Sequence, residues 1–75
     1  MNRYIHLIQR SAVHAVRDGL LPQEVVVITK DYLDEIGVKR VTEIPVAELR
    51  KAYGEMSIRF GEAVMARRNP NAQED

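Results

Sequence analysis

The sequence predicts a compact, mainly α-helical domain of three helices, the last of which is the longest. Apolar residues recur every three or four positions in the first and last thirds of the chain, which is the period of a helix that packs one side against a core. Glycine and proline separate these segments. With 75 residues, the chain has room for a single domain.

We expect the first helix to extend from Arg3 to Asp18, with Gly19 after its last turn because glycine adopts a left-handed conformation at little cost. One side is apolar and carries Tyr4, Ile5, Ile8, Ala12, Ala15 and Val16. The opposite side carries Arg3, His6, Arg10, His14 and Arg17. Leu7 and Val13 fall at the margins. The helix is therefore amphipathic, and its polar side is almost wholly basic.

Two structures are open for residues 20–37. In a helix, Pro22 would occupy the first turn and Gly37 would end it. Its apolar side would then consist of Val25, Val26, Tyr32, Leu33 and Ile36. Alternatively, the β-branched run Val25–Thr29 favours a short strand and an α+β fold. We favour the helix, because a lone strand leaves its edges unpaired.

The third helix is predicted from Val46 to Arg68. Ile44 precedes Pro45 and is therefore disfavoured in a helix, which makes Val38 to Ile44 a connection. A stripe facing the core follows at helical spacing, formed by Leu49, Ala52, Tyr53, Met56, Phe60, Ala63 and Val64. Residues 69–75 are polar and are predicted to form a disordered tail, so the helical domain should span residues 1–68.

Charge is balanced overall and segregated along the chain. Eleven Lys and Arg residues offset eleven Asp and Glu residues. Residues 1–22 carry a net charge of +2, residues 23–37 carry −3, residues 38–51 carry +2 and residues 52–75 carry −1. The neutral total argues against a strongly basic field around the whole protein, but it leaves local basic surfaces as candidate sites.

Several classes of protein are excluded by composition. The lack of cysteine excludes a disulfide scaffold and a thiolate zinc site. No segment approaches the roughly 20 apolar residues that span a bilayer, and residues 1–19 lack the apolar region of a signal peptide. We therefore expect a soluble, cytoplasmic protein that does not associate with membranes.

Catalytic and metal-binding patterns are nearly absent. The only serines are Ser11 and Ser57, and no glycine-rich phosphate loop is present. His6 and His14 are eight residues apart, whereas two helical histidines that share a metal are four apart. The sequence thus predicts no enzyme, no metal site and no cofactor.

The basic row on the first helix is the strongest functional candidate. Arg3, Arg10 and Arg17 are seven residues apart, with His6 and His14 between them. Arginine forks pair with carboxylates and phosphates, so this row is predicted to bind an acidic surface of another protein. The plain alternative is a solvated face, which every amphipathic helix has. The solvated-face alternative is weakened because charges of both signs do not alternate here: Asp18 is the only acid in the first 22 residues.

A second candidate surface lies on the third helix. Beside Ala47, the residues Gly54, Ile58, Gly61 and Met65 form a narrow stripe away from the predicted core. Glycine inside a helix costs about 1 kcal/mol relative to alanine, so the two glycines suggest close approach of another helix, from this chain or from a second copy. Because so short a chain buries little apolar surface, we predict a homodimer through this stripe.

The sequence therefore favours a non-enzymatic regulatory module that docks an acidic partner, with a DNA-binding transcriptional regulator as the alternative. Nucleic-acid contacts would then come from the same basic row or from Lys39 and Arg40. A helix-turn-helix over Thr29 to Val46 fits weakly because Pro45 interrupts its second helix. A ribbon-helix-helix dimer would use Val25–Thr29 as its strand, which offers few polar groups to read bases.

Overall fold

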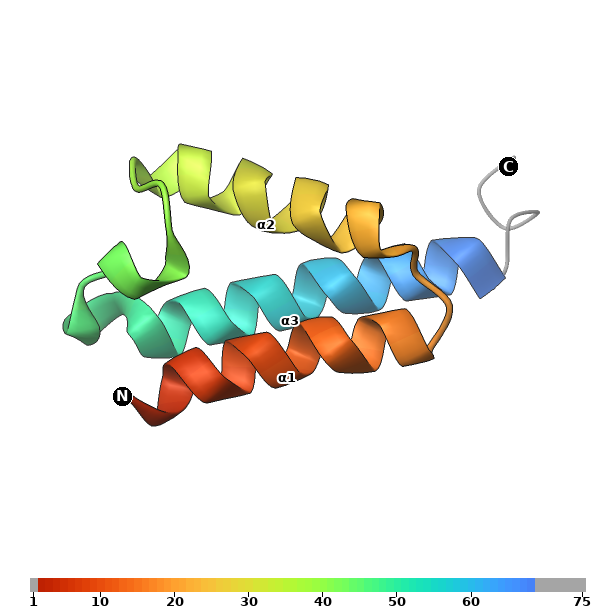
Figure 1. Ribbon diagram of the computed structural model, residues 1–75, viewed down its shortest axis with the longest axis horizontal. Coiled ribbons are helices and arrows are strands. Elements are labelled where there is room, and N and C mark those ends of the chain that lie inside the picture. Colours follow the sequence, from red (N-terminus) through yellow and green to blue (C-terminus); the bar gives the residue numbers. More distant parts are fainter. Residues whose placement is uncertain (1, 69–75) are drawn as a thin grey trace.

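The computed structural model describes residues 2–68, which form three α-helices and contain no β-strand. In chain order the elements are α1 (Arg3–Arg17), α2 (Pro22–Ile36), one turn of 3-10 helix, η1 (Val41–Glu43), and α3 (Val46–Arg68). α1 and α3 pack side by side and run in the same direction, while α2 returns in the opposite direction (Figure 1). The predicted all-helical architecture with a long last helix is confirmed.

Residues 69–75, which the sequence predicts to be a disordered tail, lie outside the described residues. Within residues 2–68, no helix has both the length and the apolar composition needed to cross a membrane.

α1 begins and ends where its sequence predicts. The side-chain Oδ1 of Asn2 accepts a hydrogen bond of 2.8 Å from the backbone N–H of Tyr4, which satisfies one of the free donors at the helix start. After the helix, Gly19 takes a positive φ of 119°. This turn lets the backbone N–H of Leu20 donate to the carbonyl of Ala15 at 3.0 Å and brings the Leu20 side chain into the core.

α2 is a helix over its whole predicted length, so the alternative of a strand at Val25–Thr29 is wrong. Within a helix, the backbone donors and acceptors of this β-branched run pair internally, whereas a lone strand would leave them unpaired. Pro22 occupies the first turn, and Gly37 ends the helix with a φ of 80°.

The core lies between the three helices and follows the predicted stripe of α3. Its buried apolar residues are Ile5, Ile8, Ala15, Leu20, Tyr32, Leu33, Ile44, Leu49, Ala52, Met56, Phe60 and Val64. On α3, Tyr53 and Ala63 are half-buried beside it. The predicted stripe is therefore the side on which both shorter helices pack.

Three residues assigned to the buried sides of α1 and α2 are exposed instead. Val26, in the second turn of α2, has 63% of its surface exposed, whereas Leu33 on the same side two turns later is buried. Val16 and Ile36 are exposed to a lesser degree, in the last turns of α1 and α2. The buried side of α2 is consequently narrower than its apolar composition indicates.

Two ion pairs connect residues near the two ends of α2 with residues of α3. The Arg59 guanidinium donates two hydrogen bonds of 2.7 Å to the two carboxylate oxygens of Glu35 and lies 5.1 Å from the centre of the Tyr32 ring. At the other end of α2, Arg67 pairs with Glu24. The hydrogen bonds from Arg59 hold the pKa of Glu35 below its ordinary value.

The lowered pKa makes a stability contribution that depends on pH. Because Glu35 binds a proton less readily in the folded state than in the unfolded chain, the contribution is present above the ordinary carboxyl range and is lost as pH falls through the folded-state pKa. We expect Glu35→Gln to lower the free energy of unfolding at about pH 7, with the difference from the parent vanishing near pH 2. Urea denaturation at both pH values measures this difference.

The matched control is Asp34→Asn, which removes the neighbouring exposed carboxylate; no ion pair within residues 2–68 includes Asp34. The change in the free energy of unfolding caused by Asp34→Asn should differ less between the two pH values than the change caused by Glu35→Gln. An equal loss of stability in Glu35→Gln at both pH values would contradict the conclusion that the charged Glu35–Arg59 pair stabilises the fold.

Candidate functional site

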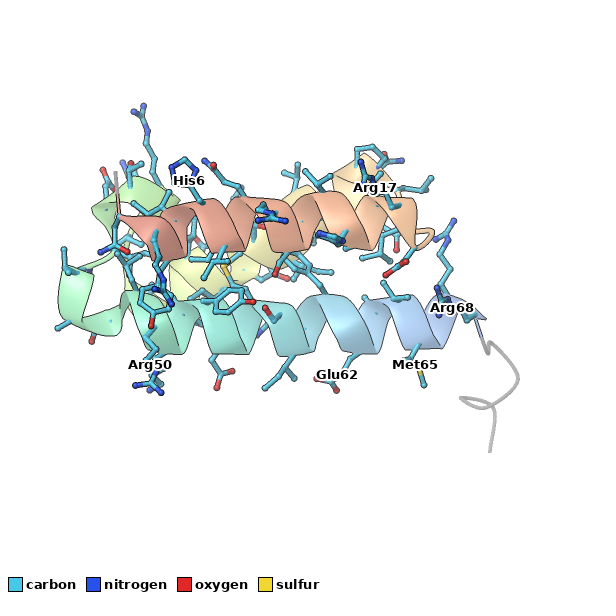
Figure 2. All side chains as sticks on the ribbon, turned by 90° about the horizontal axis from the view of Figure 1, so that it is seen from below. His6, Arg17, Arg50, Glu62, Met65 and Arg68 are labelled. Atoms are coloured by element: carbon cyan, nitrogen blue, oxygen red, sulfur yellow. The ribbon has the colours of Figure 1, made fainter. Side chains whose placement is uncertain are left out.

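The predicted basic residues of α1 form one exposed surface, which we call the basic face: Arg3, His6, Arg10, His14 and Arg17. All five side chains are exposed. Figure 2 shows His6 and Arg17 projecting from α1 on the side away from α3. The predicted clustering and exposure are confirmed, whereas binding through this face stays a prediction.

The arginines of α1 and α3 differ in their partners. Among residues 2–68, no ion pair includes Arg3, Arg10 or Arg17. On α3, by contrast, three arginines each pair with an acid of another segment: Arg59 with Glu35, Arg67 with Glu24, and Arg68 with Asp18. Asp18 is the only acid in residues 1–22, and its carboxylate pairs with Arg68 of α3.

An apolar side chain borders the basic face on its C-terminal half. A shallow depression of about 270 Å³ lies between Arg10, Val13, His14 and Arg17. Val13 is 54% exposed within it, although the sequence places this residue only at the margin of the apolar side. A partner that covers the depression can therefore combine charge pairing with burial of an aliphatic side chain.

The stripe predicted on α3 is exposed as well. Ile58 and Met65 are each 59% exposed, and Met65 points away from α1 together with Glu62 (Figure 2). A Cβ atom built at Gly54 or at Gly61 would meet no neighbouring atom within 4 Å. Within the described part of the chain, the glycines are thus not required for close packing of α1 or α2. Self-association through this stripe stays a prediction, beside the alternative that the two glycines are simply tolerated.

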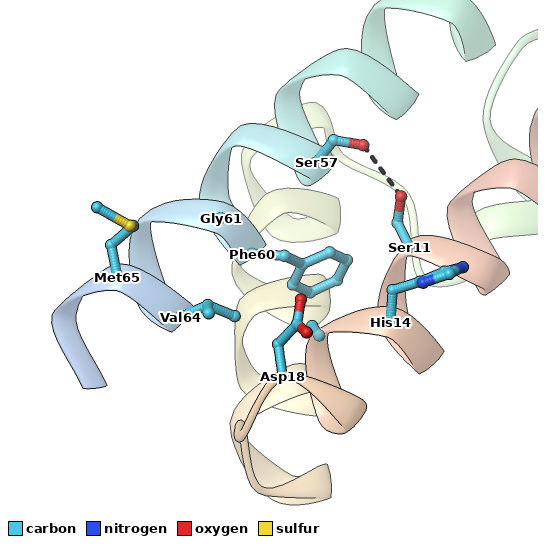
Figure 3. A pocket seen from close by; sticks show the side chains of 9 residues that line it. Ser11, His14, Asp18, Ser57, Phe60, Gly61, Val64 and Met65 are labelled. Carbon is cyan, nitrogen blue, oxygen red and sulfur yellow. Dashed lines mark hydrogen bonds between the residues drawn. The ribbon is translucent and has the colours of Figure 1, made fainter. Parts of the chain in front are cut away.

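A groove between the C-terminal halves of α1 and α3 is absent from the sequence prediction. It has a volume of about 360 Å³, and three of its lining residues, Ala15, Phe60 and Val64, are buried. Figure 3 shows Phe60 and Val64 on the α3 side of the groove. The α1/α3 groove is lined by Ser11, His14, Ala15, Asp18, Ser57, Phe60, Gly61, Val64 and Met65.

Polar contacts lie at both ends of the α1/α3 groove. The hydroxyl oxygens of Ser11 and Ser57 are 3.1 Å apart and hydrogen-bonded. Toward the C-termini, a carboxylate oxygen of Asp18 lies 3.5 Å from a guanidinium nitrogen of Arg68. The sequence signal that could have revealed this groove is the pair of small residues four apart on each facing side, Ser11 and Ala15 on α1, and Ser57 and Gly61 on α3.

Lys39 and Arg40 belong to a different segment from the basic face. Both are exposed in the connection after α2, where the backbone N–H of Lys39 donates to Glu43 at 2.9 Å. Only the single turn η1 follows α2 before Pro45, so the second helix of the helix-turn-helix is missing from Thr29 to Val46. The strand of the ribbon-helix-helix is part of α2. Neither DNA-binding template fits the described residues.

The described residues offer little arrangement for chemistry. Within residues 2–68, no group of three His, Cys, Asp or Glu side chains could hold a metal ion. Ser11 and Ser57 are bonded to each other, and among the described residues no hydrogen bond connects His14 to either hydroxyl. The serines are thus not aligned with a base.

Comparisons with models of protein families, with curated proteins and with solved structures found no match for this chain. A functional argument for it therefore depends on the charge, exposure and shape of its own surfaces.

The exposed stripe of α3 leads to a prediction about self-association. We expect the parent protein to sediment as a dimer and both Gly54→Leu and Gly61→Leu to sediment as monomers, because a leucine would hold a second helix away from the α3 backbone. Neither substitution should disturb the fold of the monomer, since both positions are open. Each substitution also replaces a glycine, which lowers the stability of a helix by about 1 kcal/mol relative to alanine.

Circular dichroism of both variants controls for folding. Two variants that keep the helical signal and the mass of the parent dimer would contradict an interface at this stripe.

Proposed function

We propose that this protein is a cytoplasmic, non-enzymatic regulatory module that forms a homodimer and docks an acidic surface of another protein through the basic face of α1. The observation that carries the proposal is that Arg3, Arg10 and Arg17 are exposed and form no ion pair within residues 2–68, while three arginines of α3 pair with acids of the same chain. The guanidinium of Arg3 lies 5.7 Å from the centre of the Tyr4 ring.

Helix stability accounts for only part of the basic face. His14 and Arg17 lie in the last turn of α1, where basic side chains suit the helix dipole. Arg3 lies in the first turn, which contains no acid, and a positive charge at this end opposes the dipole. The charge at Arg3 therefore costs the isolated helix stability, and a carboxylate of a partner would offset that cost.

The exposed Val13 and the neutral net charge support a protein partner over a nucleic acid. A phosphate backbone offers little apolar surface to Val13, whereas a protein surface can supply both carboxylates and an apolar contact. The field of the whole molecule gives no long-range attraction toward a polyanion, because its net charge is zero.

Charge reversal tests the docking function. We expect immobilised parent protein to capture acidic proteins from a nuclease-treated extract of its own cells, and we expect the double variant Arg10→Glu/Arg17→Glu to lose them, because it replaces two positive charges with negative charges that repel the partner's carboxylates. The matched control is Arg50→Glu/Lys51→Glu, which makes the same change in net charge at exposed positions of α3. It should retain the captured proteins.

Equal capture by the two double variants would contradict a role for the basic face. Random-sequence duplex DNA is the second arm of the experiment. If it binds and its affinity falls with salt at a logarithmic slope of about −2.7 per protomer, the three arginines contact phosphates and the partner is a nucleic acid.

A further inference from the structure

The depression on the basic face carries positive charge that forms no ion pair within residues 2–68. Its lining residues are Arg10, Val13, His14 and Arg17, and none of them is acidic. No ion pair among the described residues includes Arg10 or Arg17. Because both guanidinium groups are permanently charged, the depression favours a negatively charged occupant, and the exposed Val13 offers that occupant an apolar contact.

The end of α3 lies next to this depression. The side chain of Arg68, the last residue of α3, lies 3.5 Å from the carboxylate of Asp18, and Asp18 directly follows Arg17 in the sequence. Figure 2 shows Arg17 and Arg68 at the same end of the molecule. The chain beyond Arg68 therefore starts beside the C-terminal end of the basic face.

Residues 69–75 have the charge and the length to reach the depression. Glu74 and Asp75 are acidic, and no residue of this segment is basic. A segment of this length spans at most about 23 Å, whereas Arg10 lies only about 10 Å along α1 from Arg17. The segment is thus long enough to bring both carboxylates to these two arginines while the helices stay in place.

Two other arginines at this end of the molecule already have acidic partners. Arg67 pairs with Glu24, and Arg68 pairs with Asp18. Arg17, in contrast, belongs to no ion pair within residues 2–68. The charges near the end of α3 therefore direct a further acidic group to Arg17 and the depression beside it.

We propose that the depression on the basic face binds Glu74 and Asp75 of the same chain, which thereby mask the surface that docks an acidic partner. The masking rests on the proposed docking function and adds its regulation. Attachment to the same chain gives the acidic segment a high effective concentration at the depression. Each exposed ion pair contributes little, so a partner surface with more carboxylates displaces the segment.

A spin label at Gln73→Cys tests the contact directly, because the sequence contains no other cysteine. Paramagnetic broadening should weaken the backbone amide NMR signals of Val13 and His14. The variant Glu74→Gln/Asp75→Asn with the same label should lose this broadening, because it keeps the length of the segment and removes the two negative charges.

The matched control for the contact is Asp31→Asn/Asp34→Asn, which also removes two negative charges. Both acids are exposed on α2, and no ion pair within residues 2–68 includes them, so the broadening should persist. In a mixture of spin-labelled protein with isotope-enriched protein that has no label, the enriched copy should show no broadening. Broadening of the enriched copy would overturn the contact within one chain and assign the depression to a second copy.

Masking is measured with a fluorescent polyglutamate peptide in place of the partner's acidic surface. Fluorescence anisotropy should give about two- to threefold tighter binding to Glu74→Gln/Asp75→Asn than to Asp31→Asn/Asp34→Asn, a modest gain because exposed ion pairs are weak. The two variants have the same net charge, so the difference in affinity reports release of the basic face.

Failure of the contact and failure of the docking function give different results. Broadening at Val13 and His14 that is absent from the parent, or equal in Glu74→Gln/Asp75→Asn, would overturn the contact. Equal affinity of the peptide for the two neutralised variants would overturn masking, and the docking function would stand if Arg10→Glu/Arg17→Glu loses the peptide. A peptide that binds no variant at low salt would remove the docking function and masking with it, while the spin label still decides the contact.

Discussion

Both shorter helices depend on one side of α3, where apolar residues recur at helical spacing. Leu49, Met56 and Phe60 are almost fully buried along this side, and the whole core of the domain is built around them. α1 covers it along its length, whereas α2 makes fewer contacts and is additionally held by ion pairs near its two ends. Removal of water from this single stripe is therefore the interaction on which the fold rests.

The same arrangement divides the charged residues into two groups. Acids of α2 and of the turn after α1 are used inside the domain, by Arg59, Arg67 and Arg68 of α3. The basic residues of α1 are left facing outward, with Val13 among them. A neutral sequence thus yields a molecule with a cationic side, and the α1/α3 groove opens beside that side at His14.

The sequence predicts features that depend on neighbours along one helix. Gly19, Gly37 and Pro45 mark the ends of helices because their backbone preferences act locally. The exposure of Val26 is not predictable in this way, since α2 is apolar around much of its circumference and periodicity alone does not choose the buried side. The groove and the Glu35–Arg59 pair depend on residues of different helices. Spacing within each helix places small residues four apart on α1 and on α3, but it does not show that these two sides face each other.

The hydrogen bond between Ser11 and Ser57 joins residues 46 positions apart. α1 and α3 therefore meet only after the chain between them has closed into a long loop, whose entropic cost arises before the apolar stripe is covered. α2, rich in β-branched residues with modest helix propensity, lies inside that loop. Folding of this small domain should consequently be slower than that of a hairpin of two sequential helices, because its main helix pair is non-local.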